Sequence, residues 1–186
     1  MKKHLGCFLL LLSFFMSCMA TPAYATEEPA TVLVFGMTIS AGEFHMSAVK
    51  TDGSLWVWGS NAYGALGVSE LTQSTVPMKL IDHGVSSTIA GTSGLYGAIM
   101  QNGELWNWGI SGNNGRLGRT TSEWIVNPGR AMEHVRQADS GNSHTLSLKE
   151  DGSLWVWGGN QYGELGNGMQ GLRYESEWLN YNYEHS

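Results

Sequence analysis

Two histidines recur at matching places in the chain, and they are the residues that come nearest to a metal-binding pattern. His45 and His144 each follow a glycine by three positions, but no third metal ligand recurs with them. A zinc site needs three or four protein ligands held close together. The pattern therefore predicts structural hydrogen bonding at the start of a strand, and no metal site.

Two aspartates also recur, and carboxylates at paired positions can serve acid–base catalysis or calcium binding. Asp52 and Asp151 each precede a glycine, and Asn102 takes the same place in the middle of the chain. A calcium loop needs further acidic residues at alternate positions, which are missing here. Asn forms tight turns as readily as Asp, so we expect all three residues to shape turns.

Nothing in the remaining sequence has the spacing of an active site. The chain contains no glycine-rich phosphate loop, no nucleophile elbow and no His-Glu-x-x-His pattern. We therefore predict that the protein is not an enzyme and binds no cofactor. A hydrolase is the least favoured of the functional classes considered, because no nucleophile, base and orienting group occur together.

The residues just named belong to an internal repeat, which is the strongest feature of the chain. Residues 52–67 read DGSLWVWGSNAYGALG and residues 151–166 read DGSLWVWGGNQYGELG, identical at 13 of 16 positions. Residues 102–118 read NGELWNWGISGNNGRLG, the same pattern with one residue inserted. The middle copy also has Gly94-Leu95-Tyr96 where the others have a histidine, so we expect its loop to project differently.

Each repeat reads as a β-hairpin. An alternating segment at 46–50 runs into a turn and then into a strand in which Trp56 and Trp58 point to one face and Leu55 and Val57 to the other. A strand that is apolar on both faces is typical of the middle of stacked sheets. The repeat therefore predicts an all-β fold, a partial β-propeller of about three four-stranded blades.

The family that this repeat resembles can be named from its motifs. The pattern Ala-Gly-x-x-His, then Asp-Gly-x-Leu-Trp-x-Trp-Gly, then Asn-x-Tyr-Gly-x-Leu-Gly resembles the repeat of the regulator of chromosome condensation family over about residues 29 to 168. The resemblance implies a β-propeller whose glycines and Trp-Gly pairs shape the blades. We assign repeats to residues 29–78, 79–128 and 129–168, and the tail at 169–186 matches nothing in the repeat. The chain is identified as a short or truncated bacterial, secreted member.

The first 25 residues read as a signal peptide. Lys2 and Lys3 precede an apolar run from Phe8 to Met19, and Ala23-Tyr24-Ala25 is a small-x-small cleavage site. A membrane anchor is disfavoured, because spanning a bilayer takes roughly 20 apolar residues. Lipid attachment at Cys18 is a weaker alternative. We expect cleavage after Ala25 and a secreted, periplasmic or cell-surface protein.

Removing this segment changes the chemistry of the chain. Cys7 and Cys18 both lie within it, so the mature chain has no cysteine and no disulfide. It also loses Lys2 and Lys3, which leaves 8 basic residues against 16 acidic ones and a formal charge of −8. This charge argues against nucleic acid and anionic membranes as partners.

The function most consistent with this sequence is an extracytoplasmic, non-enzymatic binding module that presents propeller loops to a protein partner. The resemblance suggests an inhibitor-like or adhesion-like role. The alternative is a cell-surface carbohydrate-binding protein that uses aromatic residues outside the repeat pattern. Six residues are candidates for binding a partner. Two are arginines on the variable loop of the middle repeat, Arg116 and Arg119, which a solvated loop would also explain. Four are aromatic residues outside the repeat pattern: Trp124, Trp178, Tyr181 and Tyr183.

Three repeats are fewer than a closed propeller contains, since propellers close with about four to eight blades. An unclosed array exposes apolar sheet faces and unpaired strand edges, which favour association. We therefore expect self-association through these faces, or marginal stability of the isolated chain.

Overall fold

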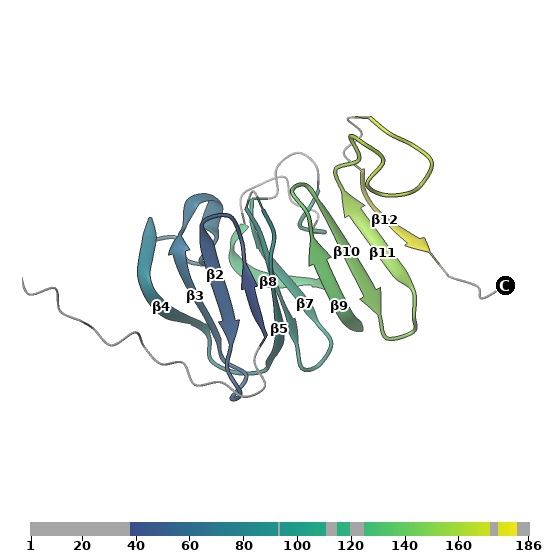
Figure 1. Cartoon of the computed structure of the whole chain (residues 1–186). Coiled ribbons are helices and arrows are strands. Elements are labelled where there is room, and N and C mark those ends of the chain that lie inside the picture. Colours follow the sequence, from purple (N-terminus) through teal and green to yellow (C-terminus); the bar gives the residue numbers. More distant parts are fainter. Residues whose placement is uncertain (1–37, 93, 111–114, 120–124, 172–174, 182–186) are drawn as a thin grey trace, which may run out of the picture. The chain divides into compact units, whose positions relative to one another are not determined.

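Figure 1 shows the computed structural model of the chain, which describes residues 38–92, 94–110, 115–119, 125–171 and 175–181. All of them belong to one compact unit that spans Val34–Ser186. The described residues form twelve strands and one short 3-10 helix, in the order β1 (Ile39–Ala41), β2 (His45–Val49), β3 (Leu55–Ser60), η1 (Ala62–Gly64), β4 (Gln73–Ile81), β5 (Val85–Ala90), β6 (Leu95–Met100), β7 (Leu105–Gly109), β8 (Ile125–Met132), β9 (Val135–Ser140), β10 (His144–Lys149), β11 (Leu154–Gly158) and β12 (Glu175–Tyr181).

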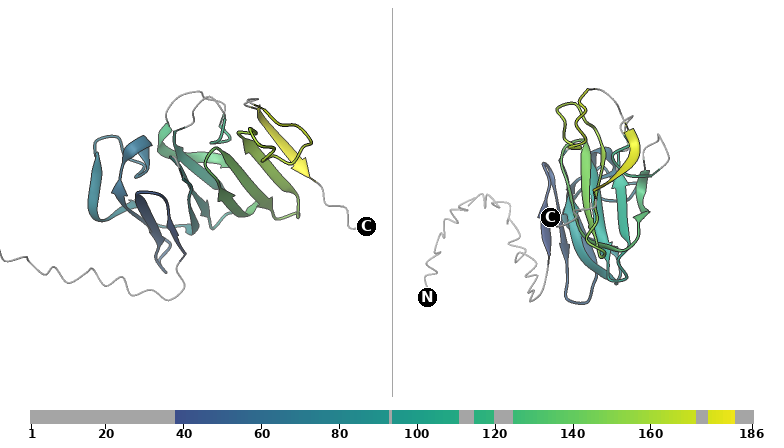
Figure 2. Two further views of the ribbon diagram at one scale, coloured as in Figure 1. Left: turned by 45° about the horizontal axis from the view of Figure 1, so that its top comes forward. Right: turned by 90° about the vertical axis from the view of Figure 1, so that its right-hand side faces the viewer.

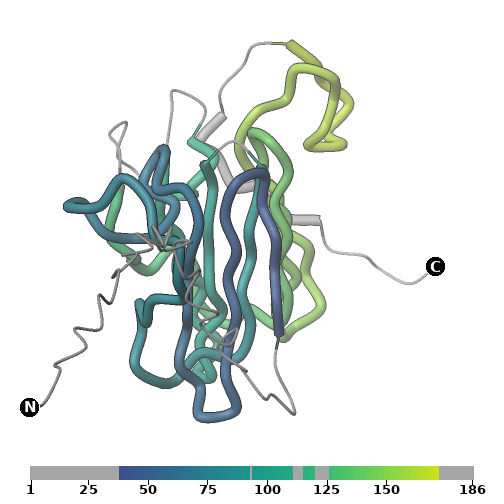
Figure 3. The backbone as a smooth tube through the Cα atoms, turned by 60° about the vertical axis from the view of Figure 1, so that its left-hand side comes forward, coloured from purple at the N-terminus to yellow at the C-terminus, as the bar shows by residue number. Residues whose placement is uncertain are grey.

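The strands form three four-stranded sheets, β1 to β4, β5 to β8 and β9 to β12. Within each sheet every strand pairs antiparallel with the next one along the chain, as the views in Figure 2 and the backbone trace in Figure 3 show. The expected fold, an all-β partial propeller of three four-stranded blades, is confirmed.

In the first and third sheets, the turn between the second and third strands is held by an aspartate. Asp52 Oδ1 accepts hydrogen bonds from the backbone N of Ser54 at 2.9 Å and from its Oγ at 2.6 Å. Gly53 adopts a φ of 78°, which a residue with a side chain rarely adopts. Asp151 holds Ser153 in the same way in the third sheet. The interpretation of these aspartates as turn residues is confirmed.

The core lies between consecutive sheets. One cluster joins the first and second sheets, and a second cluster joins the second and third. The first includes Val57, Leu66, Ala98 and Trp108, and the second includes Ile99, Leu105, Val135 and Trp157. Burying this apolar surface is the main stabilising contribution, since the described part of the chain contains no cysteine.

The strand that was expected to be buried on both faces differs between repeats. Leu55 and Val57 of β3 are buried, but Trp56 and Trp58 are only partly buried. The two tryptophans that correspond to Trp58 are buried fully, Trp108 at 1% exposure and Trp157 at 0%. Only the second and third sheets therefore bury this position, because each packs against the loop of the sheet before it.

The turns also connect neighbouring sheets through the backbone. The carbonyl of Gly53 accepts a hydrogen bond of 2.9 Å from the backbone N of Val85, the first residue of the next sheet. Gly103 and Val135 form the same bond at 2.8 Å between the second and third sheets. The regular period of the repeat thus places equivalent backbone groups in register from one sheet to the next.

The fourth strand of the third sheet lies in the tail at 169–186, which matches nothing in the repeat. There β12 pairs antiparallel with β11, with Val156 opposite Leu179. Strand pairing uses backbone groups, which any sequence supplies, whereas the repeat signature reflects side-chain packing, so this strand completes the sheet without the repeat motif.

Candidate partner-binding site

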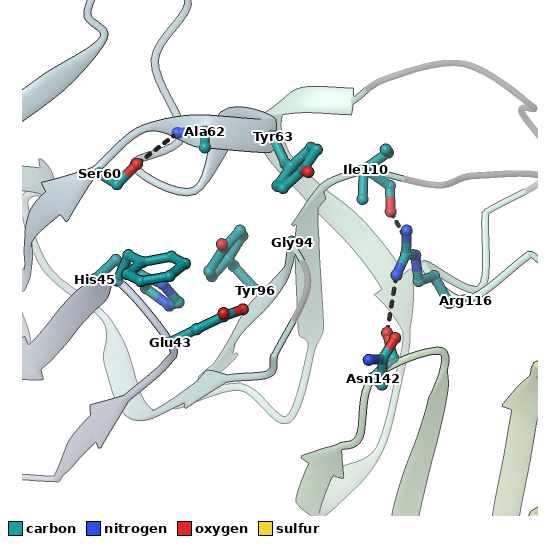
Figure 4. Close-up of a pocket in the computed structure, with 11 residues that line it drawn as sticks. Glu43, His45, Ser60, Ala62, Tyr63, Gly94, Tyr96, Ile110, Arg116 and Asn142 are labelled. Atoms are coloured by element: carbon teal, nitrogen blue, oxygen red, sulfur yellow. Dashed lines mark hydrogen bonds between the residues drawn. The ribbon is translucent and has the colours of Figure 1, made fainter.

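A pocket of about 390 Å³ lies where loops of all three repeats meet. Figure 4 shows its lining side chains converging from the ends of several strands. We call it the inter-repeat pocket, and it is lined by Glu43, Phe44, His45, Ser60, Ala62, Tyr63, Gly94, Tyr96, Ile110, Arg116 and Asn142. Pockets of this size commonly hold a small molecule or a side chain of a binding partner.

Two aromatic side chains are exposed on this pocket. Phe44, in the turn before β2, is 69% exposed, and Tyr63, in η1, is 49% exposed. Aromatic rings in contact with water carry apolar area that a partner can bury, and for this reason they are enriched in protein interfaces. The two rings come from separate segments of the first repeat, so the fold and not the local sequence brings them to one pocket.

Tyr63 has a strained backbone, and its side chain packs closely against Gly94. Its φ is 63°, in the left-handed region that residues with side chains seldom adopt. A Cβ added at Gly94 would lie 2.7 Å from the Cβ of Tyr63, so only glycine leaves room for the tyrosine there. Tyr162, the matching residue of the third repeat, does not have this conformation. Backbone strain of this kind gathers at functional sites.

The pocket is built where the middle repeat departs from the pattern. Gly94 takes the place of Phe44 in the register of the hairpin, and Tyr96 takes the place of Met46. The small residue opens the pocket and the large ring forms its wall. The degenerate Gly94-Leu95-Tyr96 sequence was therefore the signal for this site, although it could not reveal which other loops complete it.

The buried side of the pocket is formed by two neutral rings. His45 and Tyr96 meet edge to face, with ring centroids 4.1 Å apart and planes at 88°. Burial lowers the pKa of His45 to about 4 and raises the pKa of Tyr96 to about 12, so neither ring carries charge near neutral pH. Among the described residues His45 Nε2 has no hydrogen-bond partner, so this atom does not make the structural hydrogen bond expected of the histidine.

Arg116 is a buried link between repeats. Its Nε donates to the carbonyl of Ile110 at 3.0 Å and its guanidinium donates to the carbonyl of Asn142 at 2.8 Å. Burial lowers the pKa of Arg116 from its usual high value. The residue is only 8% exposed, so a solvated loop does not explain it. It lines the inter-repeat pocket while holding the loops of the second and third repeats together.

The other candidate residues from the sequence lie elsewhere. Arg119 donates to the carbonyl of Asn107 at 3.3 Å, within the second repeat, and does not line the pocket. Trp178 and Tyr181 lie in β12, of which the structure describes the backbone alone. Trp124 and Tyr183 fall outside the described residues. A partner-binding role for these aromatics stays a prediction.

No group of three or more potential metal ligands gathers among the residues that the structure describes. His45 and His144 lie in equivalent strands of the first and third sheets. The same part of the chain contains no helix long and apolar enough to cross a membrane. The absence of a metal and of a cofactor stays a prediction.

Three antiparallel four-stranded sheets that repeat one sequence motif define the class of β-propeller repeat proteins. Two sequence profiles for the regulator of chromosome condensation (RCC1) repeat match the chain, one at residues 38–65 and 135–164 and the other at residues 52–91. The chain therefore contains RCC1 repeats, as its sequence motifs predicted.

A relative in Arabidopsis thaliana shows the extent of the similarity. The mitochondrial RCC1 domain-containing protein RUG3 is 32% identical over 148 residues, which cover 70% of this chain and 32% of RUG3. The chain spans from 3% to 32% of the length of this and similar curated relatives.

Two solved structures share the fold. Human WBSCR16 matches 66% of this chain and 33% of its own, with a TM-score of 0.58 and 24% identity. Yeast RCC1 (Prp20), solved with Kap60 bound, matches 69% of this chain and 44% of its own, with a TM-score of 0.50 and 18% identity. At these identities the likeness concerns the fold alone.

Proposed function

We propose that the protein is an extracytoplasmic, non-enzymatic interaction module that binds a protein partner at the inter-repeat pocket. The observation that carries the proposal is the pair of exposed aromatic rings, Phe44 and Tyr63, on a pocket that the middle repeat opens with Gly94. A partner segment that inserts an apolar side chain buries these rings together with its own surface.

Two further lines of evidence support this function. RCC1-like repeat proteins mediate protein interactions, and yeast RCC1 (Prp20), which shares the fold, was solved with the protein Kap60 bound. The buried side of the pocket, formed by the neutral His45 and Tyr96, suits an apolar side chain, whereas the charged lining residues Glu43 and Arg116 lie beside it. The extracytoplasmic location rests on the apolar run and small-x-small site within the first 25 residues.

The first experiment selects ligands from a phage-displayed library of random peptides against the immobilised chain. We expect the selected peptides to be rich in aromatic or aliphatic residues and to lose at least about tenfold in affinity for the Tyr63→Ser variant, the loss typical of a central interface aromatic. Tyr162→Ser is the matched control, because Tyr162 is 80% exposed in the equivalent loop but lies outside the pocket. Peptides that bind both variants equally would contradict the proposal.

The carbohydrate alternative is tested in parallel on a glycan array. Exposed rings also stack on sugars, so Phe44 and Tyr63 would serve that function as well. Under the protein-partner proposal the array shows no glycan whose binding depends on Tyr63. A glycan bound by the wild type and lost in Tyr63→Ser would overturn it in favour of sugar recognition.

A further inference from the structure

One hydrogen bond recurs at both boundaries between consecutive sheets. The indole Nε1 of Trp108 in β7 donates to the carbonyl oxygen of Ala65 at 3.0 Å. The indole Nε1 of Trp157 in β11 donates to the carbonyl oxygen of Arg116 at 2.9 Å. Each tryptophan therefore reaches from its own sheet into the loop that follows the third strand of the preceding sheet.

The first sheet carries the same donor without its acceptor. Trp58 in β3 pairs with Met46 in the register in which Trp108 pairs with Tyr96. Among the described residues its indole makes no hydrogen bond, and the ring is only partly buried. Met46 is 48% exposed, whereas Tyr96 is 5% exposed. We call the surface formed by Trp58 and Met46 the donor face.

The third sheet carries the same acceptor loop. The segments 61–67 and 160–166 share one hydrogen bond, although their backbones differ at Tyr63 and Tyr162. In each segment the side-chain oxygen of the first asparagine accepts from the leucine backbone N, at 2.8 Å and 3.0 Å. Glu164 holds the place of Ala65, whose carbonyl receives the indole of Trp108. Gly166 is exposed where Gly67 is buried.

Leu146 lies on the side of the third sheet that also carries the acceptor loop. Ser47 of the first sheet is 5% exposed because its hydroxyl meets that of Thr88 in the next sheet, at 2.8 Å. The equivalent residue in the third sheet is Leu146, an apolar side chain that is 38% exposed. We call the surface formed by Leu146 and the carbonyl of Glu164 the acceptor face.

We propose that the donor face of one copy of this chain docks on the acceptor face of a second copy, with Trp58 Nε1 donating to the carbonyl of Glu164. The interface continues the sheet-to-sheet boundary that the chain already builds twice, and one chain carries both halves of it. It buries the exposed Met46 and Leu146, which supplies the apolar driving force. Head-to-tail contacts close into a ring when the rotation allows. Two copies bring six sheets together, and known propellers contain about four to eight blades.

The test measures the mass of the exported and purified chain by light scattering and sedimentation velocity over a range of concentrations. The wild type is expected at twice the mass of one chain. Trp58→Lys and Leu146→Lys are each expected to be monomeric, because each places a charge in one of the two faces. Mixing the two variants restores a dimer, since each retains the face that the other lacks.

A finer pair of variants separates the hydrogen bond from the ring. Trp58→Phe keeps an aromatic ring but removes the donor, and is expected to weaken each of the two interfaces of the ring about tenfold, as loss of one buried hydrogen bond does. Trp56→Phe is the matched control, because the indole of Trp56 donates to Ser54 in the turn before its own strand and its loss leaves association unchanged.

Three results would overturn the proposal. These are a wild-type chain that stays monomeric at all concentrations, a dimer that survives Trp58→Lys, and two monomeric, folded variants that fail to associate on mixing. A variant that is merely misfolded cannot restore association in the mixture, so a positive mixing result supports head-to-tail docking independently of the stability of either variant.

Discussion

The indole Nε1 of Trp157 lies 2.9 Å from the carbonyl oxygen of Arg116, and the side chain of this arginine lines the inter-repeat pocket. The same carbonyl also accepts a hydrogen bond from Thr145 Oγ1 at 3.0 Å. The third sheet thus holds the loop that completes the pocket, so the packing of the sheets and the geometry of the site depend on one residue.

Removing this indole should destabilise the fold. Trp157→Ala is expected to lower the free energy of unfolding by about 3–5 kcal/mol, the range for deleting a large buried aromatic. Trp157→Phe is expected to cost about 0.5–1.5 kcal/mol, because the buried carbonyl of Arg116 loses one donor but keeps Thr145 Oγ1. Urea denaturation measures both. Tyr162→Ala, at an exposed ring, should leave stability unchanged, and equal effects of these variants would refute a core role for Trp157.

The glycine that opens the pocket can be tested against a glycine of similar backbone conformation. Gly94 has a φ of 89° and Gly152 a φ of 86°, but a Cβ at Gly152 would meet no atom within 4 Å. Gly94→Ala should therefore destabilise by about 1–3 kcal/mol more than Gly152→Ala, since it adds steric contact with Tyr63 to the same backbone strain. Thermal melts of both variants give the difference, and equal losses would show that Tyr63 moves aside freely.

Burial of His45 should lower the free energy of unfolding in mild acid. The unfolded chain binds a proton at His45 below about pH 6.5, but the folded chain does so only below about pH 4. The unfolded state therefore binds more protons in this window, and stability falls as the pH drops from 6.5 to 4, by about 3 kcal/mol from this residue.

Denaturation at closely spaced pH values, compared with a His45→Gln variant, measures this contribution. The variant should lose less stability than the wild type over the same window. His134→Gln is the control, because the side chain of His134 is 69% exposed. A wild type and a His45→Gln variant with parallel pH profiles would mean that His45 is solvated in solution.

If the protein has no metal site, as the sequence predicts, zinc and a chelator leave the melting temperature unchanged. A metal that binds only the folded state must stabilise it, so calorimetry with and without chelator is a direct measurement. A melting temperature that falls on chelation would restore His45 and His144 as metal ligands.

If the first 25 residues are a signal peptide that is removed on export, the mature chain begins at Thr26. Mass spectrometry of the protein collected outside the cytoplasm should find the chain cut after Ala25. A chain that retains Met1, or one that is lipidated at Cys18, would contradict the proposed location.

The sequence was sufficient for the features that repeat. The turns at Asp52 and Asp151 and the two-sided apolar strands followed from local residue types, because each turn and strand is specified within a few positions. The inter-repeat pocket did not follow, because Phe44, Gly94 and Arg116 lie on three different loops that only the stacking of sheets brings together. The burial of Arg116 was hidden for the same reason, since the carbonyl of Asn142 that it contacts belongs to the next repeat.

The most direct test of the central claim is a titration of the ¹⁵N-labelled chain with a peptide chosen by the library selection, followed by NMR. The shifted amide signals are expected to centre on Phe44, Tyr63 and Gly94, and the Tyr63→Ser variant is expected to show no such shifts. Signals that shift instead at the loop of Tyr162, or a peptide that binds Tyr63→Ser as tightly as the wild type, would contradict the assignment of the pocket as the partner-binding site.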